Sequence, residues 1–182
     1  MGFKASVADQ ARGMDDFGAQ ATTFIPRLRR YARALTGDTL LADDLVQDTL
    51  ERALVKRHLW RQGSDLRAWM FTIMHNVFVN QVRARVADAT VALDAEAYDV
   101  PARSNPVDLL EVGDIDAAIR RLPGEQREVL LLVALEQLSY GETAQALGIP
   151  LGTVMSRLYR ARERLRLLLG GEPVASALKV VK

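Results

Sequence analysis

The sequence of 182 residues contains no cysteine and only two histidines, His58 and His75. Without cysteine the chain has no disulfide, no thiolate metal site and no cysteine nucleophile. Two histidines are also too few for a metal centre or a catalytic triad built on histidine. We therefore expect no metal and no catalytic site built on cysteine or histidine.

Long apolar runs are missing as well. No stretch approaches the roughly 20 apolar residues that a transmembrane helix needs. The first residues, MGFKASVADQARGMDD, lack the hydrophobic region of a signal peptide. We expect a cytoplasmic protein that does not use a membrane or a small-molecule substrate. A hydrophobic content of 49% and a charged content of 26% are nevertheless typical of a folded domain.

The charges that are present are unevenly distributed. The net charge is only +1, but five arginines and one glutamate lie between Arg157 and Arg166, whereas the segment from Asp88 to Asp116 is mostly acidic. Such a distribution indicates separate surfaces for separate partners.

The segment 138–169 predicts two helices joined by a short turn. The first has Tyr140, Ala144 and Leu147 on one face and ends at Gly148, which can adopt the left-handed conformation of a helix cap. The second, from Thr153 to Leu169, carries an apolar stripe with helical spacing, formed by Val154, Leu158, Ala161, Leu165 and Leu168. This arrangement predicts a helix-turn-helix whose second helix is the recognition helix.

A polar face lies beside that apolar stripe, and it consists of Thr153, Ser156, Arg160 and Arg164, with Arg157 at its boundary. Hydroxyl groups can contact base edges and arginines can contact phosphates or guanine. A merely solvated basic face is the alternative. The glycine-bounded turn favours nucleic-acid binding over that alternative.

The first half of the chain predicts a helical bundle. A helix from Asp16 to Leu35 is followed by Asp38, an N-cap for a helix over 39–57. In that helix apolar positions such as Leu45 can be buried. The opposite face collects Asp43, Asp44, Gln47, Asp48 and Glu51. This acidic face either docks on a basic partner or is solvated.

A third helix, over 65–86 and capped by Ser64, has a wide apolar arc and a different polar face. That face carries Trp69, Thr72, Asn76, Asn80 and Arg83. An aromatic ring, amides and a cation on one face can bind unpaired bases. Alternatively, Trp69 closes the edge of the core.

The remaining segments complete an all-α protein of two small helical domains. A mobile arm over 1–15 precedes the first domain, 16–87, and an acidic, flexible linker over 88–112 connects it to the second domain, 113–170. Within the second domain, a short helix begins near Asp114, and a helix over 124–137 supports the helix-turn-helix. A tail over 171–182 has no assigned role.

Three blocks of the sequence resemble the extracytoplasmic-function group of the bacterial sigma-70 family. They are LADDLVQDTLERAL at 41–54, DLRAWMFTIMHNVFVNQVRAR at 65–85 and LPGEQREVLLLVALEQLSYGETAQALGIPLGTVMSRLYRARERL at 122–165. The resemblance covers about 16–169. It implies that the two domains are sigma region 2 and sigma region 4.

The resemblance also implies roles for individual residues. The expected contacts with the clamp helices of core RNA polymerase are Asp44, Leu45, Gln47, Asp48 and Glu51. The expected contacts with the melted minus-ten element are Trp69, Asn76, Asn80 and Arg83. The expected contacts with the minus-thirty-five element are Thr153, Ser156, Arg157 and Arg160, to which the polar face of the helix adds Arg164.

The implied function is a sigma factor that directs promoter-specific transcription initiation and is held inactive by an anti-sigma factor. Such a protein is not an enzyme, so we expect no catalytic residue and no cofactor. Two blocks also look similar to the sigma factors of the alphaproteobacterial general stress response. Three positions depart from the family pattern: Asn80, Gly141 and Thr143. The alternatives are a stand-alone helix-turn-helix regulator, which would bind DNA without polymerase, and a sigma-like mimic that sequesters an anti-sigma protein.

Overall fold

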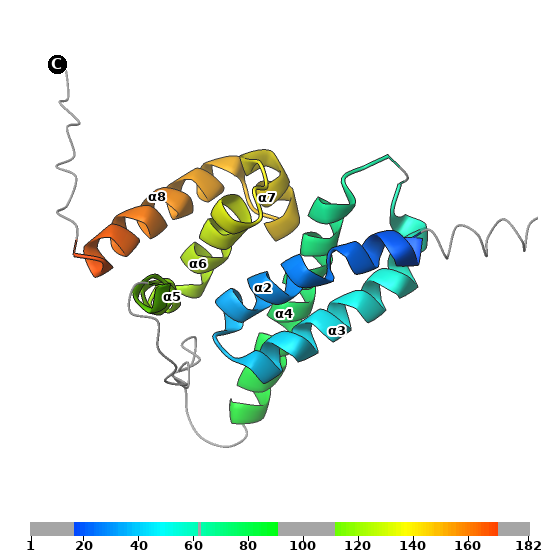
Figure 1. Ribbon diagram of the computed structural model, residues 1–182, viewed down its shortest axis with the longest axis horizontal. Helices are drawn as coiled ribbons and strands as arrows, with labels where there is room; N and C mark the ends of the chain where they lie inside the picture. Colours follow the sequence, from blue (N-terminus) through cyan, green and yellow to red (C-terminus); the bar gives the residue numbers. More distant parts are fainter. Residues whose placement is uncertain (1–16, 62, 91–111, 171–182) are drawn as a thin grey trace, which may run out of the picture.

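The computed structural model describes residues 17–61, 63–90 and 112–170, and all regular structure in these ranges is helical (Figure 1). The expected arm at 1–15, the tail at 171–182 and most of the expected linker lie outside the described residues. The named elements are α2 (Ile25–Thr36), α3 (Thr39–Lys56), the 3-10 turn η1 (Arg57–Leu59), α4 (Leu66–Thr90), α5 (Val112–Arg120), α6 (Gly124–Leu130), the π-helical turn η2 (Leu131–Leu135), α7 (Tyr140–Leu147) and α8 (Leu151–Leu168).

The first half is the predicted bundle. A helical segment over 17–23 leads into α2, which has Pro26 in its first turn, where a missing N–H has no cost. Helix α2 ends at Gly37, whose φ of 70° is the left-handed cap. Asp38 then starts α3 by accepting a hydrogen bond from the backbone N–H of Leu41 at 3.0 Å. Figure 1 shows α2 and α3 side by side, with α4 crossing them.

Replacing Asp38 with alanine is expected to lower the free energy of unfolding by about 1 kcal/mol, within a range of roughly 0.5–2. The substitution leaves an N–H at the start of α3 without its acceptor. Urea unfolding followed by circular dichroism measures the change. Asp38→Asn is the matched control, because asparagine caps helices equally well; an equal loss in both variants would contradict the capping role.

Helix α4 begins and ends later than the sequence predicts. Asp65, not Ser64, is its cap: its carboxylate accepts hydrogen bonds from the N–H groups of Arg67 at 2.8 Å and Ala68 at 3.3 Å. The Ser64 hydroxyl instead donates to the carbonyl of Arg61. Partial burial opposes ionisation of Asp65, but these N–H groups and the charge of Arg67 together lower the pKa of the carboxyl. The helix continues to Thr90, so residues 88–90 are not part of a linker.

The supporting helix of the second half is interrupted, where the sequence predicts one helix to Gln137. Helix α6 is α-helical only to Leu130, and η2 then closes with a hydrogen bond from Glu136 N–H to Leu131 C=O at 3.0 Å. Gln137 follows with a φ of 56°. Ser139 starts α7 with a capping box, in which its hydroxyl and the carboxylate of Glu142 each accept from the other's backbone N–H.

The helix-turn-helix is confirmed, with two corrections. Gly148 has a φ of 63° and caps α7, and α8 begins at Leu151, two residues before the predicted Thr153. The fixed φ of Pro150 suits the position just before a helix, so the helix starts at Leu151 and not at Thr153. In α7 the predicted Tyr140 is 38% exposed, and Thr143 takes the buried position instead. The apolar stripe of α8 lies on the core as predicted.

The two halves pack against each other around one continuous hydrophobic core. Helix α4 of the first half contacts α7 of the second, and α2 contacts α5, α6 and η2. The core cluster includes buried side chains from both halves, such as Leu28, Tyr31 and Phe71 together with Leu132 and Leu158. Burial raises the pKa of the Tyr31 hydroxyl well above its usual value. The shared core thus holds the two halves together in this compact arrangement.

Candidate functional site

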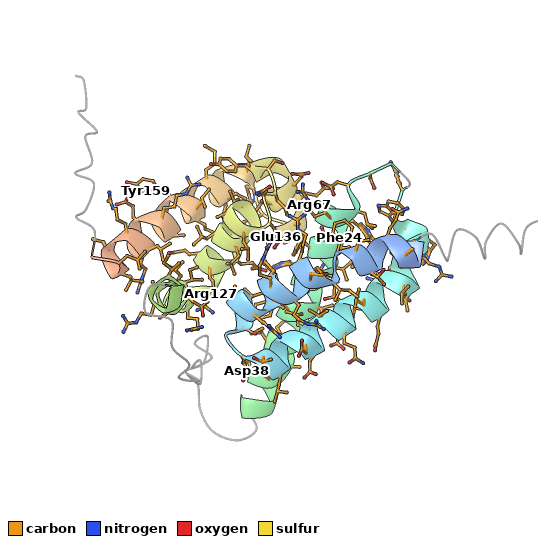
Figure 2. All side chains as sticks on the ribbon, viewed as in Figure 1. Phe24, Asp38, Arg67, Arg127, Glu136 and Tyr159 are labelled. Carbon is orange, nitrogen blue, oxygen red and sulfur yellow. The ribbon has the colours of Figure 1, made fainter. Side chains whose placement is uncertain are left out.

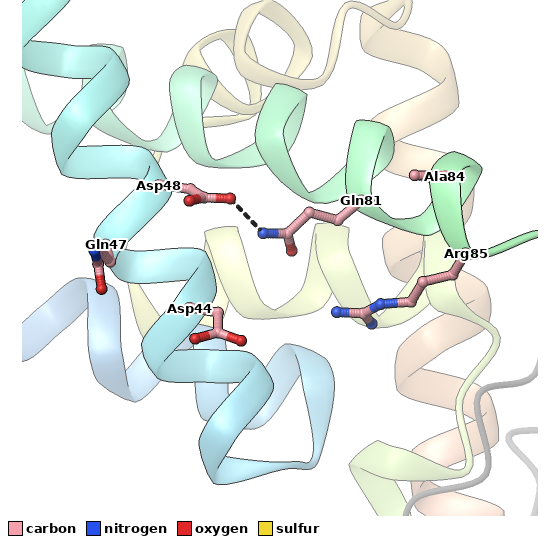
Figure 3. Close-up of a pocket in the computed structure, with 6 residues that line it drawn as sticks. All are labelled: Asp44, Gln47, Asp48, Gln81, Ala84 and Arg85. Carbon is pink, nitrogen blue, oxygen red and sulfur yellow. Dashed lines mark hydrogen bonds between the residues drawn. The ribbon is translucent and has the colours of Figure 1, made fainter. Parts of the chain in front are cut away.

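The acidic face of α3 borders a shallow polar groove that is shared with α4 (Figure 3). Its volume is about 410 Å³, and it is lined by Asp44, Gln47, Asp48, Gln81, Ala84 and Arg85. The Gln81 side-chain amide donates a hydrogen bond to Asp48 at 2.8 Å and thereby holds this carboxylate at the groove. The Gln47 amide similarly donates to Glu51 at 3.0 Å. Four of the five residues expected to contact polymerase thus lie together.

The fifth, Leu45, is not at the surface. Its side chain is fully buried on the opposite side of α3 and belongs to the hydrophobic core. The apolar pattern of α3 predicts this burial, whereas the resemblance placed Leu45 among the contacts. In this structure Leu45 lies beneath the acidic face and not on it, and its part in polymerase binding stays a prediction.

The polar face of α4 points away from the second half. Asn76, Asn80 and Arg83 are exposed, and the Asn76 amide donates to the carbonyl of Thr72 at 2.8 Å. Trp69 is only half-exposed: its ring packs edge-on against Phe17, with centroids 5.9 Å apart, and Phe17 also contacts Trp60 at 5.8 Å. The structure therefore places Trp69 in an aromatic cluster at the edge of the core.

Helix α8 carries the expected polar residues, but one of them turns away from the others. Ser156, Arg160 and Arg164 are exposed, and Thr153 is half-buried. The Arg157 guanidinium instead forms an ion pair with Glu125 of α6 at 2.7 Å. Arg157 is thus held against the supporting helix, and the exposed face of α8 is centred on Ser156 and Arg160.

Sequence reasoning missed an apolar stripe next to this face. Leu151, Met155 and Tyr159 follow one another four residues apart along α8 and are 50%, 53% and 59% exposed. Figure 2 shows Tyr159 at the outer side of α8, away from the rest of the protein. The signal was present in the sequence, because these apolar residues fall off the stripe that faces the core. The predicted contact face contained polar residues only and therefore did not include these three.

Sequence reasoning also missed a carboxylate that joins the two halves. Glu136 follows the apolar run of η2, and its charged side chain is fully buried. It accepts from Arg27 Nε at 2.9 Å and from Arg30 Nη2 at 3.0 Å, both on α2. Arg67 of α4 donates to the Glu136 backbone carbonyl at 3.4 Å. A buried carboxylate needs such partners, since an unpaired buried charge is strongly destabilising.

Other contacts between described residues also join the two halves. His75 of α4 lies 2.5 Å from a carboxylate oxygen of Glu128 on α6. The Arg127 guanidinium donates to the Leu35 carbonyl at the end of α2, at 3.0 Å, and to carbonyls of the second half at Ile119, Arg120 and Leu122. These contacts add polar specificity to the apolar packing.

Within the described ranges, no group of three or more His, Asp or Glu side chains is placed to hold a metal ion. Over the same ranges, none of the helices has the length and apolar character required to cross a bilayer.

Two family profiles match the chain. Residues 22–75 match the family described as the Sigma2 domain of PhyR, and residues 113–165 match Sigma-70, region 4. Among curated proteins, the chain is 39% identical over 145 residues to the ECF RNA polymerase sigma factor EcfG of Rhodopseudomonas palustris, covering 80% of each chain. It is 32% identical to the ECF RNA polymerase sigma factor SigM of Bacillus subtilis, covering 76% of this chain and 86% of that protein.

Solved structures show the same similarity. The sigma factor RpoE of Bartonella quintana, in a complex with the anti-sigma factor NepR, superposes with a TM-score of 0.70 at 36% identity, covering 85% of this chain and 97% of that one. CnrH, in a complex with the cytosolic domain of CnrY, superposes with a TM-score of 0.61 at 26% identity, covering 88% and 94%.

Proposed function

Because the chain belongs to the ECF RNA polymerase sigma factors, we propose that its two halves, 16–87 and 113–170, act as sigma region 2 and sigma region 4. The first binds core RNA polymerase and the minus-ten element, and the second binds the minus-thirty-five element. The observation that carries this assignment is the pair of surfaces: the acidic face of α3, which borders a polar groove shared with α4, and a basic exposed face on α8. The chemistry of nucleotide addition belongs to the polymerase.

The acidic face of α3, at the groove that it shares with α4, is the proposed polymerase contact. Asp44, Asp48 and Glu51 present carboxylates from successive turns of α3, and hydrogen bonds from Gln81 and Gln47 hold two of them in place. A basic partner surface is complementary to this array, and such complementarity favours association and orientation. The clamp helices of the polymerase are the expected partner.

The exposed face of α8 is the proposed reader of the minus-thirty-five duplex. Ser156 and Arg160 offer a hydroxyl and a guanidinium, and Met155 and Tyr159 add apolar surface beside them. In the first half, Asn76, Asn80 and Arg83 offer amides and a cation to the unpaired minus-ten strand. Trp69 contributes to this minus-ten surface indirectly, through its packing in the aromatic cluster.

Binding both promoter elements requires the two halves to separate. The numbering of the elements places them about 25 base pairs apart, which is roughly 85 Å at 3.4 Å per step. A compact chain of this length has a radius of gyration of only about 16 Å. The segment 91–111 can bridge up to about 70 Å when extended. The compact arrangement is therefore the conformation of the chain away from the promoter.

An anti-sigma factor is the proposed regulatory partner, and the cytoplasm, where polymerase and promoters are found, is the proposed location. The solved relative from Bartonella quintana is bound to an anti-sigma factor. PhyR is the anti-anti-sigma factor in a solved complex with the anti-sigma factor NepR, so the match of residues 22–75 to its Sigma2 domain supports regulation through an anti-sigma factor. The same match also favours one alternative function, a mimic that binds an anti-sigma factor without directing transcription.

In-vitro transcription separates these two functions. Purified core polymerase is incubated with fragmented genomic DNA of the source organism, with and without the protein. New transcripts that start a fixed distance downstream of a shared two-part motif are expected from a sigma factor. A folded protein that yields no such transcripts with active core polymerase would instead be assigned as the mimic or as a stand-alone regulator.

Replacing Arg160 with alanine is expected to weaken binding to the minus-thirty-five element by about 1–3 kcal/mol, because a guanidinium that contacts a guanine edge contributes that much discrimination. Titration of the holoenzyme with matched and altered minus-thirty-five duplexes measures it. Arg157→Ala is the comparison: its guanidinium is held by Glu125, so we expect a smaller change in selectivity. Unchanged selectivity in the Arg160 variant would exclude its role in reading the element.

A further inference from the structure

The contact between the halves contains a site built to hold an anion. The guanidinium groups of Arg27 and Arg30, which are three residues apart on α2, each take one oxygen of the Glu136 carboxylate. Arg27 also donates to the Glu136 carbonyl at 3.1 Å, and Arg30 donates to the Leu135 carbonyl at 3.4 Å. Figure 2 shows Arg67 and Glu136 next to each other at the boundary between the halves. We call Arg27, Arg30 and Arg67 the arginine cradle.

The carboxylate that occupies the cradle, that of Glu136, belongs to the second half of the chain. In the proposed function this half moves away from the first half when promoter DNA binds. Glu136 lies at the carbonyl end of a helix, where a carboxylate is unfavourable unless cations offset it. Its side chain is completely buried by the cradle, whereas those of Arg27 and Arg30 remain 34% and 53% exposed. When the halves separate, the three arginines remain on α2 and α4 but lose the Glu136 carboxylate.

We propose that the arginine cradle is a phosphodiester-binding site, which Glu136 occupies in the compact chain and the promoter backbone occupies in the open one. The inference rests on the proposed function, since only a chain that opens on a promoter exposes the cradle. Guanidinium groups donate charge-assisted hydrogen bonds to carboxylate and phosphate oxygens alike, so two phosphate oxygens can take the places of the two Glu136 oxygens. Glu136 thereby competes directly with DNA.

The charges around the cradle favour DNA over a protein partner. Among the described residues, neither Arg27 nor Arg30 has an ion pair other than that with Glu136, whereas Arg67 keeps Asp65 at 3.0 Å. Opening thus leaves at least two uncompensated cations. The proposed polymerase contact on α3 is acidic and calls for a basic partner surface, which would repel the cradle. A DNA backbone offers a row of phosphates at regular spacing.

The test uses holoenzymes made with the wild-type chain, with the double variant Arg27→Gln/Arg30→Gln, and with Arg29→Gln as the matched control. Arg29 lies on the same helix and has a similar ion pair, with Asp43 at 3.0 Å, but it does not contact Glu136. Binding to a fluorescent promoter duplex is measured as a function of salt. The double variant is expected to reduce the slope of log affinity against log salt by about 2, because each lost phosphate contact removes about 0.9. The control is expected to keep the wild-type slope.

The free chain supplies a second, independent arm. Glu136→Gln removes the competing charge, so the free variant is expected to bind the same duplex more tightly and with a steeper salt slope than the wild type. If the double variant does not fold, the Glu136→Gln measurement tests the proposal by itself. Unchanged slopes in both arms would overturn the inference, as would a loss of core-polymerase affinity in the double variant without a change in its DNA slope. Failure of the wild-type holoenzyme to select promoters would instead refute the proposed function.

Discussion

Replacing Leu45 with alanine is expected to lower the free energy of unfolding by about 2–5 kcal/mol, because the side chain is fully buried in the core shared by the helices of the first half. The loss combines the transfer free energy of the removed methyl groups with the cavity that remains. Thermal and urea unfolding, followed by circular dichroism, measure the change.

This experiment also decides between two roles for Leu45. As a core residue it affects polymerase binding only through the fraction of folded protein, so binding measured well below the unfolding temperature is expected to stay near that of the wild type. As a direct contact it would lower polymerase affinity with little change in stability. Leu45→Met, which keeps the side-chain volume, is the matched control and is expected to cost less than about 1.5 kcal/mol.

Reversing the charges of Asp48 and Glu51 to lysine is expected to weaken binding to core polymerase by several kcal/mol, since it sets like charges against a basic partner surface. Both residues lie on the exposed side of α3, and Asp48 lines the groove. The helical content of the protein is expected to stay the same. Titration of labelled core polymerase with the double variant measures the loss.

Asp43→Lys is the control for this charge reversal. Asp43 lies on the same helix, but its carboxylate is paired with Arg29 and does not line the groove. The control changes the charge by half as much as the double variant, so a specific docking surface predicts a loss for the double variant far more than twice that of the control. Equal losses would reduce the effect to net charge, and wild-type affinity in the double variant would remove the groove from the polymerase contact.

The sequence predicted most helices of the structure because their signals are local. Gly37 and Gly148 mark helix ends through a backbone conformation that favours glycine, and Asp38 marks a helix start. The apolar stripe of α8 predicted which side is buried. The errors at Ser64 and Thr153 are shifts of one or two residues, where two neighbouring residues compete for the same end of a helix.

The features that the sequence could not predict depend on contacts between distant segments. Glu136 is joined to Arg27 and Arg30 across more than 100 residues, and no local pattern indicates which arginine meets which carboxylate. The same reason explains Arg157: helical spacing places it beside Arg160, but only the position of Glu125 on α6 shows where its guanidinium goes. Packing of the two halves against each other was likewise absent from the sequence patterns, which indicated two separate domains.

The π-helical turn at Leu131–Leu135 sets the direction of Glu136, the residue at its C-terminal end. A π turn holds one residue more than an α turn, so the Glu136 side chain is rotated by about 100° relative to its place in an uninterrupted α-helix. That rotation aims Glu136 at α2. Shortening the run by one residue would restore the regular pitch, preserve the composition of the helix almost unchanged, and turn the carboxylate away from its arginines. The spacing of this apolar run therefore carries information that its hydrophobicity does not.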